Sequence, residues 1–562
     1  MTLFEQLLTA RGLSGHARDA FLNPSYDAKH DPFLLPDMYE AVTRLVAAYH
    51  NQERITIYGD YDIDGLTATT VLLDAFDSFG FKYVDAFIPN RFVEGYGLTL
   101  DAVERIAATG TQLIVTVDCG SLSEKEIVRA AELGVDVIVT DHHNVASIQP
   151  PAIAVINPKR LLQDHPEEYQ KLRLKPDSRL KGAVYPFLDL AGVGVAFKLI
   201  QALQTKLNGL DQGQEKWLLD LVALGTVCDV VTLVDENRAN VYWGLKVLAR
   251  TKRPGLKALM AVSGVEPETV NARHLGFGLG PRMNAAGRLE TAQHSLDLLR
   301  AKDSLLALEK AQQLDALNIA RRNDQDKIFK EAIIQAEQYR NDNVLVVSSK
   351  GWNHGIIGIV AAKLLEKYKK PAYVLEEMEY EAKGSARSYG DFSAADAIRA
   401  ADDIITKGGG HAFAAGVTMP VDAIDAFRKR VNEYYVSKKY FNQSQLLLPK
   451  ADIIVEKLSH VNEDLVRQFE TLEPFGSGNP EPVLHALNLL VVNNRRMGSD
   501  AQHVKLEMQD GMGKSMQFLS FNAPSHFFLE PGEHATVWFQ PTVNEWQGRR
   551  SIEGRLLHLE PL

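Results

Sequence analysis

Acidic and imidazole side chains directly follow three short apolar runs of the sequence. Residues 59–65 read GDYDIDG, residues 117–120 read VDCG and residues 140–143 read TDHH. If these segments meet, like charges about 4 Å apart repel by roughly 4 kcal/mol at an effective dielectric near 20. Divalent cations among them would remove that repulsion, and paired cations about 3.5–4 Å apart recur in enzymes that hydrolyse phosphate esters. The residues therefore predict a two-metal phosphoesterase site.

A single aspartate at the end of a strand has a simpler explanation, because it can cap the helix that follows. Asp118, which precedes Cys119-Gly120-Ser121, is a candidate for that role. The explanation weakens when several neighbouring strand ends carry acids or imidazoles. Mixed oxygen and nitrogen ligands suit Mn²⁺ better than Ca²⁺, while Mg²⁺ is also compatible. Cysteine pairs in zinc-finger spacing are absent from the sequence, which argues against a structural zinc site.

The three acidic segments are expected to converge because residues 54–158 alternate between strand-like and helix-like patterns. The strand-like runs are ITIY, DAFIPN, QLIVTV, DVIVT and AIAVIN, and the helical runs between them include LTATTVLLDAF and EKEIVRAAELG. Such alternation predicts a doubly wound parallel sheet with helices on both faces. Ligands of an open sheet of this kind bind outside the carboxyl ends of its strands. The acidic segments follow three of those ends.

The rest of the chain predicts further elements and domains. Residues 158–186 are polar and indicate a surface insertion, and residues 301–340 lack Gly and Pro, which predicts one or two long helices. A second α/β pattern covers residues 343–437, and short strand-like runs in residues 446–562 predict a small β-barrel. A chain of 562 residues is expected to form three or four domains.

Composition excludes several classes of protein. The sequence shows neither a secretory leader nor an apolar stretch long enough to span a bilayer. Its two cysteines, Cys119 and Cys228, exclude a disulfide framework, fit a reducing cytoplasm and suggest buried side chains more than nucleophiles. The net charge of −11 argues against nonspecific coating of nucleic acid but leaves room for a basic groove. A Walker-type phosphate loop is absent, so nucleoside triphosphate hydrolysis is not indicated.

Motifs along the whole chain resemble the DHH phosphoesterase superfamily. DYDIDG, VDCG, DHH (141–143) and GTVCDVV (225–231) are similar to its four catalytic motifs, and GWNHGIIG, GSARS and GGGHAFAAG resemble the associated DHHA1 domain. Within the superfamily the chain resembles the RecJ family of single-strand-specific 5′→3′ DNA exonucleases. That narrower resemblance rests on PNRFVEGYGL, LAGVGVAF, GFGLGPRMNAAGRL and EPFGSGNPEPV. A short triplet such as DHH is weakly specific, but this many motifs in order are very specific.

The resemblance implies an α/β fold with a C-terminal OB-like barrel. The implied parts are an N-terminal segment (1–50), a doubly wound DHH domain (51–300), a connecting helix (301–340), a DHHA1 domain (341–440) and an OB-like nucleic-acid-binding domain (446–562). In the family, the first and second α/β domains form a cleft that the barrel closes into a channel. A narrow channel of that kind admits one strand and refuses a duplex.

The resemblance also implies a ligand set for two divalent ions, Mn²⁺ or Mg²⁺. The implied ligands are Asp62, Asp64, Asp118, His142 and Asp229. Asp118 occupies the position that bridges both ions, and Asp60 either ligates or orients a ligand. His143 matches a histidine that meets the scissile phosphate; its alternative is a hydrogen bond that orients a ligand. Cys119 and Cys228 stand where relatives often have Asn and Ala, and neither is expected to bind metal.

Residues that hold the DNA strand are implied in the same way. Arg91, Ser385 and Arg387 match a pocket for the 5′ phosphate, to which arginine is a natural partner. Arg282 and Arg288 match basic positions near the cleft, and His411 matches a position that contacts substrate. An isolated arginine is more often a surface charge, so these roles depend on motif context. The barrel aromatics either stack bases or fill the barrel core; they are Trp538, Phe539 and Trp546.

The expected function is removal of 5′-mononucleotides from single-stranded DNA in repair and recombination. Expected partners are a strand with a 5′ end and the helicase and single-strand-binding protein that deliver it, and the expected state is a monomer. One alternative is a DHH phosphodiesterase acting on short oligoribonucleotides or cyclic dinucleotides, although such proteins look shorter and lack the C-terminal barrel. The other is a noncatalytic single-strand-binding scaffold, which an intact ligand set disfavours.

Overall fold

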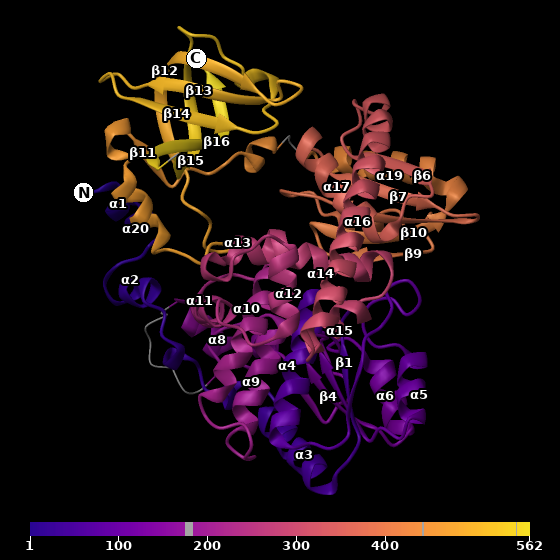
Figure 1. Ribbon diagram of the computed structural model, residues 1–562. Coiled ribbons are helices and arrows are strands. Elements are labelled where there is room, and N and C mark those ends of the chain that lie inside the picture. Colours follow the sequence, from indigo (N-terminus) through magenta and orange to yellow (C-terminus); the bar gives the residue numbers. More distant parts are fainter. Residues whose placement is uncertain (175–183, 441–442, 547) are drawn as a thin grey trace. The chain divides into compact units, whose positions relative to one another are not determined.

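The computed structural model describes residues 1–174, 184–440, 443–546 and 548–562 of the chain (Figure 1). These residues form two compact units. The first unit comprises residues 1–280, 299–304 and 449–562, and the second comprises residues 281–298 and 305–448. Among the described residues, no helix is both long and apolar enough to cross a membrane.

A parallel five-stranded sheet forms the centre of the first unit. Its strands are β1 (Ile55–Gly59), β2 (Val84–Phe87), β3 (Leu113–Val117), β4 (Asp136–Thr140) and β5 (Ala154–Ile156), in the order β2-β1-β3-β4-β5. All neighbouring pairs are parallel, so the predicted doubly wound sheet is confirmed. Every residue of β1 and β3 is buried, as expected for a parallel sheet covered on both faces.

Helices cover both faces of this sheet. The helices are α3 (Met38–Asn51), α4 (Ile63–Phe79), α5 (Leu100–Ala108), α6 (Glu124–Glu132) and α9 (Gly192–Leu203). Residues of α5 and α6 pack with Tyr58, Ile114 and Val139 of the strands in one hydrophobic core, and α3, α4 and α9 contact the sheet from the other side. The strand order places the carboxyl ends of β1, β3 and β4 side by side.

A mainly helical segment completes this α/β part. Its elements are α10 (Leu219–Cys228), α11 (Asp235–Leu248), α12 (Pro254–Val262), α13 (Ala272–His274) and the π-helix η6 (Leu275–Leu279). Helix α10 packs against α4, α9 and α11, and its apolar side chains are buried all round. The predicted insertion forms η3 (Pro158–Arg160), α7 (Leu161–Asp164) and α8 (Pro166–Leu174), and residues 175–183 lie outside the described part of the chain.

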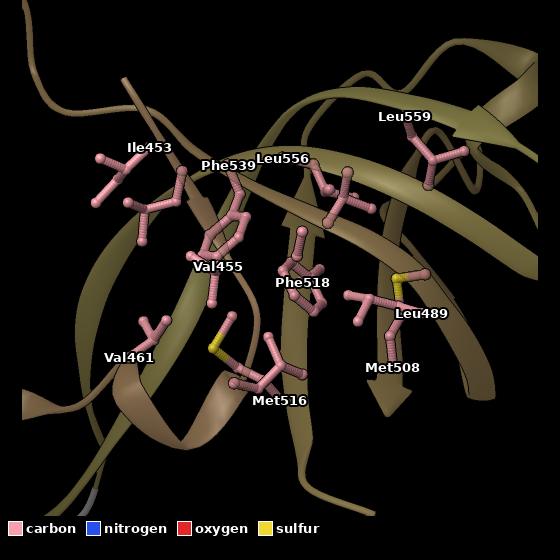
Figure 2. Close-up of a cluster of buried hydrophobic side chains, with 14 of the residues drawn as sticks. Ile453, Val455, Val461, Leu489, Met508, Met516, Phe518, Phe539, Leu556 and Leu559 are labelled. Atoms are coloured by element: carbon pink, nitrogen blue, oxygen red, sulfur yellow. The ribbon is translucent and has the colours of Figure 1, made fainter. Parts of the chain in front are cut away.

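A closed β-barrel at the C-terminal end confirms the predicted small barrel. Its strands are β11 (Ile453–Val455), β12 (Leu484–Met497), β13 (His503–Gln509), β14 (Ser515–Ser520), β15 (His534–Trp546) and β16 (Arg549–Pro561). Pairing of β12 with β15 closes the ring β12-β13-β14-β16-β15. Phe518, Phe539 and Met508 fill its interior (Figure 2). Helices α1 (Leu3–Ala10) and α20 (Glu463–Glu470) pack on this barrel, while α2 (Gly15–Leu22) follows α1.

The second unit contains the predicted long helix and a second α/β fold. The long helix is α16 (Ser304–Gln338), a single helix of 35 residues, and α14 (Gly280–Leu289) and α15 (Gln293–Arg300) precede it. The strands are β6 (Leu345–Lys350), β7 (Ala372–Glu377), β8 (Glu381–Arg387), β9 (Lys407–Gly410) and β10 (Ala414–Pro420), in the order β6-β7-β8-β10-β9. The remaining helices are α17 (His354–Tyr368), α18 (Ala394–Arg399) and α19 (Ile424–Ser437).

Candidate metal centre

The acidic segments after β1, β3 and β4 meet at the carboxyl edge of the parallel sheet, where the C-terminal end of α10 joins them. Potential ligand atoms lie within 4.8 Å of one another in three overlapping groups: Asp60, Asp62 and Asp118; Asp64, His142 and Asp229; and Asp118, His142 and His143. Every residue predicted to ligate or act at the metals belongs to at least one group. The overlap at Asp118 and His142 is the arrangement that two adjacent ions would require.

His142 lies at the centre of this cluster. Its Nε2 atom is 3.1 Å from Asp118 Oδ1, 3.5 Å from Asp229 Oδ2 and 3.8 Å from Asp64 Oδ2. Burial, together with the nearby charge of His143, lowers the pKa of His142 to about 3. The imidazole is therefore neutral at physiological pH, which leaves a nitrogen lone pair available to a cation.

Four buried atoms of the cluster have no hydrogen-bond partner among the described residues. They are Asp60 Oδ1, Asp118 Oδ1, His142 Nε2 and Asp229 Oδ2. Burying a polar atom without a partner is costly, and such atoms are rare in native proteins. All four are electron-pair donors, and each of the four residues belongs to at least one of the three ligand groups. Their donor set of carboxylate oxygens and one imidazole nitrogen fits Mn²⁺ or Mg²⁺.

Burial and mutual repulsion raise the pKa of the acids in this cluster. Burial, reinforced by the charge of Asp62, raises the pKa of Asp64 to about 7. Burial, with the charges of Asp64 and Asp62, raises the pKa of Asp229 to about 9. The pKa values of Asp60 and Asp118 are raised for the same reasons. The protein thus holds its acids where their charged forms are unfavourable unless positive charge is added.

The DYDIDG segment runs from the end of β1 into the first turn of α4. Asp62 is the N-cap residue, and its Oδ1 accepts hydrogen bonds from the backbone N–H of Asp64 at 2.9 Å and of Gly65 at 3.2 Å. A Cβ atom on Gly65 would lie 2.5–2.7 Å from backbone atoms of Asp60. The glycine therefore allows the chain to fold back closely enough for the acids to share one site.

The LAGVGVAF segment lies against two of the acids, Asp64 and Asp118. Backbone N–H groups at the start of α9 donate to Asp64, from Gly192 at 2.6 Å and from Val193 at 2.9 Å. A Cβ atom on Gly192 would lie 2.7 Å from Asp118 Cβ. The segment thus fixes the Asp64 carboxylate and leaves room for Asp118. The sequence did not reveal this role, because it depends on which helix faces the strand ends.

Asp118 has a strained backbone rather than a capping role. Its φ of +62° lies in the left-handed region, which non-glycine residues seldom adopt and which clusters at functional sites. The following helix, α6, begins at Glu124 with Ser123 as N-cap. The alternative that Asp118 caps this helix is therefore wrong.

Asp141 is a positioning residue that the predicted ligand set omits. Its Oδ1 accepts hydrogen bonds from the backbone N–H of His142 at 2.7 Å and of His143 at 3.1 Å, and lies 2.9 Å from His143 Nδ1. Burial opposes the charged form, but the hydrogen bond and charge of His143 outweigh it and hold the pKa of Asp141 below its usual range. The sequence signal that could have identified Asp141 was its place as the first residue of the DHH triplet.

His143 is oriented by this carboxylate and stays accessible to solvent. Its side chain is 38% exposed. Burial favours the neutral ring, but the hydrogen bond and charge of Asp141 raise the pKa of His143 above its ordinary value. The Tyr96 hydroxyl lies 3.1 Å from His143 Nδ1 and donates to the backbone oxygen of Asp118 at 3.4 Å. Tyr96 lies within the PNRFVEGYGL motif, and its contacts were not foreseen.

Arg91 of the same motif lies near the acid cluster. Its guanidinium sits over the ring of Tyr61, 4.2 Å from the ring centroid. Its charge favours ionisation of Asp60. The Nε atom is buried without a hydrogen-bond partner among the described residues. This donor is suited to an anion that approaches the centre.

The remaining predicted substrate residues lie in the second unit. Arg387 Nη1 lies 3.5 Å from Ser385 Oγ on β8, and a Cβ on Gly358 of α17 would meet both side chains within 3.2 Å. Burial lowers the pKa of Arg387. Arg282 forms an ion pair with Asp315 at 2.8 Å, and Arg288 donates to the backbone oxygen of Gly355 at 3.0 Å. His411 is exposed after β9.

The aromatic residues of the barrel that were predicted to stack bases or fill the core lie in different environments. Phe539 is fully buried in the barrel core (Figure 2). Trp538 is only partly buried and stacks on His485, with ring centroids 4.1 Å apart and an interplanar angle of 21°. The side chain of Trp546 lies outside the described part of the structure. Of the two explanations, core packing holds for Phe539, and base stacking stays a prediction for Trp538.

Comparisons with known proteins match three parts of the chain to family models. The DHH family N-terminal domain matches residues 54–226, the DHHA1 domain matches residues 341–437, and the RecJ OB domain matches residues 454–558. The order of the matches is that of the motifs in the sequence.

Curated relatives align with nearly the whole chain. The single-stranded-DNA-specific exonuclease RecJ of Bacillus subtilis is 36% identical over 98% of this chain and 66% of its own length. The RecJ exonuclease of Dickeya dadantii is 33% identical over 94% of this chain and 91% of its own length. The chain thus spans just under two thirds of the Bacillus protein and most of the Dickeya protein.

Solved structures show the same fold. The crystal structure of RecJ from Thermus thermophilus in complex with Mn²⁺ matches with a TM-score of 0.80 and 28% identity, over 99% of this chain and 75% of that one. The corresponding Mg²⁺ complex matches with a TM-score of 0.74 and 27% identity, over 99% and 74% of the two chains.

Proposed function

Because this chain belongs to the RecJ family of single-stranded-DNA-specific exonucleases, we propose that it degrades single-stranded DNA from the 5′ end and releases 5′-mononucleotides. The observation that carries the proposal is the set of four buried, unpartnered donor atoms on Asp60, Asp118, His142 and Asp229. A noncatalytic scaffold would have no need to keep them.

The proposed cofactors are two divalent cations, Mn²⁺ or Mg²⁺. The proposed ligands are Asp62, Asp64, Asp118, His142 and Asp229, with Asp60 either ligating or orienting. Bound cations would supply a water of lowered pKa and neutralise charge on the phosphate oxygens. Asp118 is proposed to contact both ions, the role that its motif position implies, and it belongs, like His142, to two of the overlapping ligand groups. The backbone N–H groups of Gly192 and Val193 hold Asp64 in place for this purpose.

His143 is proposed to act on the scissile phosphate. Asp141 engages its Nδ1 atom, so the ring is fixed and its Nε2 atom is left for substrate. Its raised pKa favours a protonated ring that donates a hydrogen bond to a phosphate oxygen. Hydrolysis would break the bond between phosphorus and the 3′ oxygen of the terminal nucleotide. The released nucleotide keeps its own 5′ phosphate, and the shortened strand begins with a new one.

Recognition of the strand is assigned to basic and hydroxyl side chains. Arg91, Ser385 and Arg387 are proposed to bind the 5′ phosphate. Arg387 supports this role because burial lowers the pKa of its guanidinium, a cost that binding an anion would offset. Arg282, Arg288 and His411 are proposed contacts to the rest of the strand. The domain bounds 51–300, 341–440 and 446–562 are proposed as the parts that perform these tasks.

The alternative phosphodiesterase for short oligoribonucleotides or cyclic dinucleotides is not favoured. The closed barrel formed by residues 484–561 belongs to the RecJ OB domain, and it supplies a surface that such short substrates do not need. Degradation of a long 5′-phosphorylated strand, compared with that of a dinucleotide and a cyclic dinucleotide at equal concentration, separates the two activities. Preference for the short substrates would overturn the proposal.

The direct test uses single-stranded DNA labelled at its 5′ end, with Mn²⁺ or with EDTA. We expect labelled mononucleotides with Mn²⁺ and none with EDTA. Lewis-acid stabilisation of the transition state contributes several kcal/mol, so Asp118→Ala is expected to lose about 10³-fold or more in rate. Asp101→Ala, which removes an exposed carboxylate in the same unit, is the matched control and should retain full activity. Persistent release by Asp118→Ala protein would contradict the two-metal assignment.

Partners, location and oligomeric state complete the proposal. A helicase and a single-strand-binding protein are proposed to deliver the strand during DNA repair and recombination. A cytoplasmic location fits the two free cysteines, Cys119 and Cys228. The proposed monomer can be checked by light scattering after size-exclusion chromatography, where a mass near 62.4 kDa is expected and twice that mass would contradict it.

A further inference from the structure

A cavity lies in the first unit, away from the metal centre. It has a volume of about 460 Å³, within the range of small-molecule sites. Its lining includes one aromatic and four basic side chains: Trp217, Lys252, Arg253, Arg300 and Lys302. None of them belongs to a motif that the proposed nuclease function uses.

The cavity lies at the opposite end of the two helices that carry metal ligands. Asp74 of α4 lines it, ten residues after Asp64, which corresponds to roughly 15 Å along the helix. Asp220, at the start of α10, also lines it, whereas Asp229 caps the far end of that helix. A small molecule in this cavity would therefore be separate from the metal centre.

Trp217 gives the cavity an exposed aromatic face. It lies on the short 3-10 helix η4 (Gln214–Leu218), and 48% of its surface is exposed. The ammonium group of Lys252 lies 4.9 Å from its ring centroid. A half-exposed indole beside a cation offers a stacking surface for a flat ring next to a site for negative charge.

The charges of the lining favour an anion. Arg253 is paired with both carboxylates of the cavity, Asp74 and Asp220, and its Nε atom lies 3.2 Å from Asp220. Within the described ranges, Lys252 and Lys302 form no ion pair, and both are exposed. Arg300 is paired with Asp77 at 3.7 Å, so the charges that are left to bind an anion are those of Lys252 and Lys302. A phosphate monoester, with a charge of about −1.5 to −2 at pH 7, suits these two ammonium groups.

We propose that this cavity binds a nucleoside monophosphate, with the base stacked on Trp217 and the phosphate held by Lys252 and Lys302. The partly buried Arg253 is held in the lining by its two carboxylate partners, Asp74 and Asp220. This site goes beyond the proposed nuclease function and does not depend on it.

The test is calorimetric titration of Asp118→Ala protein with dAMP in EDTA, so that neither metal nor turnover contributes. Adenosine and inorganic phosphate are titrated in parallel. Adenosine tests the proposed base stacking alone, and inorganic phosphate tests the proposed anion binding alone. We expect saturable binding of one dAMP per chain that is tighter than binding of either fragment. Equal affinity for dAMP and phosphate would overturn the proposal, because it would leave no role for the indole.

Variants in the same background locate the site. Loss of base stacking in Trp217→Ala is expected to weaken dAMP binding about tenfold. The double variant Lys252→Glu/Lys302→Glu should weaken it at least as much, while Lys125→Glu, a charge reversal at an exposed position of α6, should leave it unchanged. Thermal unfolding of each variant checks that the fold is intact. Unchanged dAMP affinity in well-folded Trp217→Ala protein would overturn the proposal.

The outcomes also separate this site from the nuclease. Trp217→Ala in the otherwise unchanged chain should keep full exonuclease activity on labelled single strands. A protein that binds dAMP through Trp217 but never degrades DNA would contradict the proposed function alone. A protein that degrades DNA but shows no Trp217-dependent binding would contradict this inference alone.

Discussion

Two clusters of buried charge in the first unit are built in opposite ways. Lys198 and Glu236, which are 2% and 4% exposed, form an ion pair. The hydroxyl of Tyr185 donates a hydrogen bond to Glu236, and the Lys198 ammonium donates one to the backbone oxygen of His30 at 2.7 Å. In the metal centre, by contrast, four buried polar atoms have no hydrogen-bond partner among the described residues. Nearby acids there repel one another instead of being neutralised.

The difference indicates which buried charges serve folding and which serve function. A buried pair with complete hydrogen bonding is neutral overall, and removing one member leaves an isolated charge. A buried group of acids without a cation destabilises the fold, so it is retained only where something else binds. Mutations should therefore affect stability in one cluster and activity in the other.

The largest expected effect is on activity at the metal centre. Asp229→Asn keeps the shape of the side chain and removes one proposed ligand charge. Loss of several kcal/mol of transition-state stabilisation would lower the exonuclease rate by about 10³-fold. The free energy of unfolding of the metal-free variant should be no lower than that of the parent, because burying an amide is less costly than burying a carboxylate. Urea unfolding in EDTA measures this, and marked destabilisation would contradict the comparison.

A substitution in the Lys198–Glu236 cluster should destabilise the protein without altering the metal centre. Glu236→Gln leaves the Lys198 ammonium buried without its counterion, which costs about 3–5 kcal/mol of unfolding free energy. Urea unfolding gives this value, and Mn²⁺ titration of the folded variant should still show two ions. Glu433→Gln, which breaks an exposed pair with Lys429, is the control and should cost less than about 1 kcal/mol. Equal effects of the two substitutions would remove the distinction between the clusters.

A smaller effect is expected where a fully bonded carboxylate supports the centre. Asp141→Asn removes the charge that orients His143 but none of the proposed metal ligands. Loss of such an orienting partner typically lowers activity roughly 10–100-fold. Steady-state kinetics should show the loss in kcat, with two Mn²⁺ ions still bound per chain. Wild-type kcat would show that His143 does not need this carboxylate.

A further expected effect is a pH trend in the stability of the metal-free protein. Asp64 and Asp229 have pKa values of about 7 and about 9 when folded, against 3.8 for an ordinary aspartate. From about pH 4 upward the unfolded chain has lost protons that the folded chain retains. Stability is therefore expected to be highest at low pH within this window and to fall as pH rises through 7 and 9. Melting temperatures in EDTA and in Mn²⁺ should diverge with pH; parallel curves would contradict the account.

Much of the fold could be predicted because its pattern is local. The strand runs from Ile55 to Ile156 are short, apolar and separated by helical spacing. The absence of Gly and Pro in residues 301–340 predicted one or two long helices, and the structure has one, α16. The convergence of acids at the sheet edge followed from the parallel topology. The identities of individual ligands came from motif resemblance.

The parts that escaped prediction depend on contacts between distant segments. Nothing in the local sequence shows that the backbone N–H groups of Gly192 and Val193 donate hydrogen bonds to Asp64. The contact of the Asp141 carboxylate with the His143 ring is equally hidden in the local sequence. Pairing of Arg282 with Asp315 could not be foreseen either, because a basic residue in a motif looks the same whether or not an acid neutralises it. Trp538 and Phe539 are neighbours in sequence, but alternation along the strand separates core from surface.

Anomalous scattering from a crystal soaked in Mn²⁺ is the most direct measurement. The account predicts two manganese peaks at the carboxyl edge of β1, β3 and β4, within bonding distance of Asp118, His142 and Asp229. A single peak, or peaks only at surface carboxylates, would contradict the claim that these buried acids are retained to hold a pair of cations.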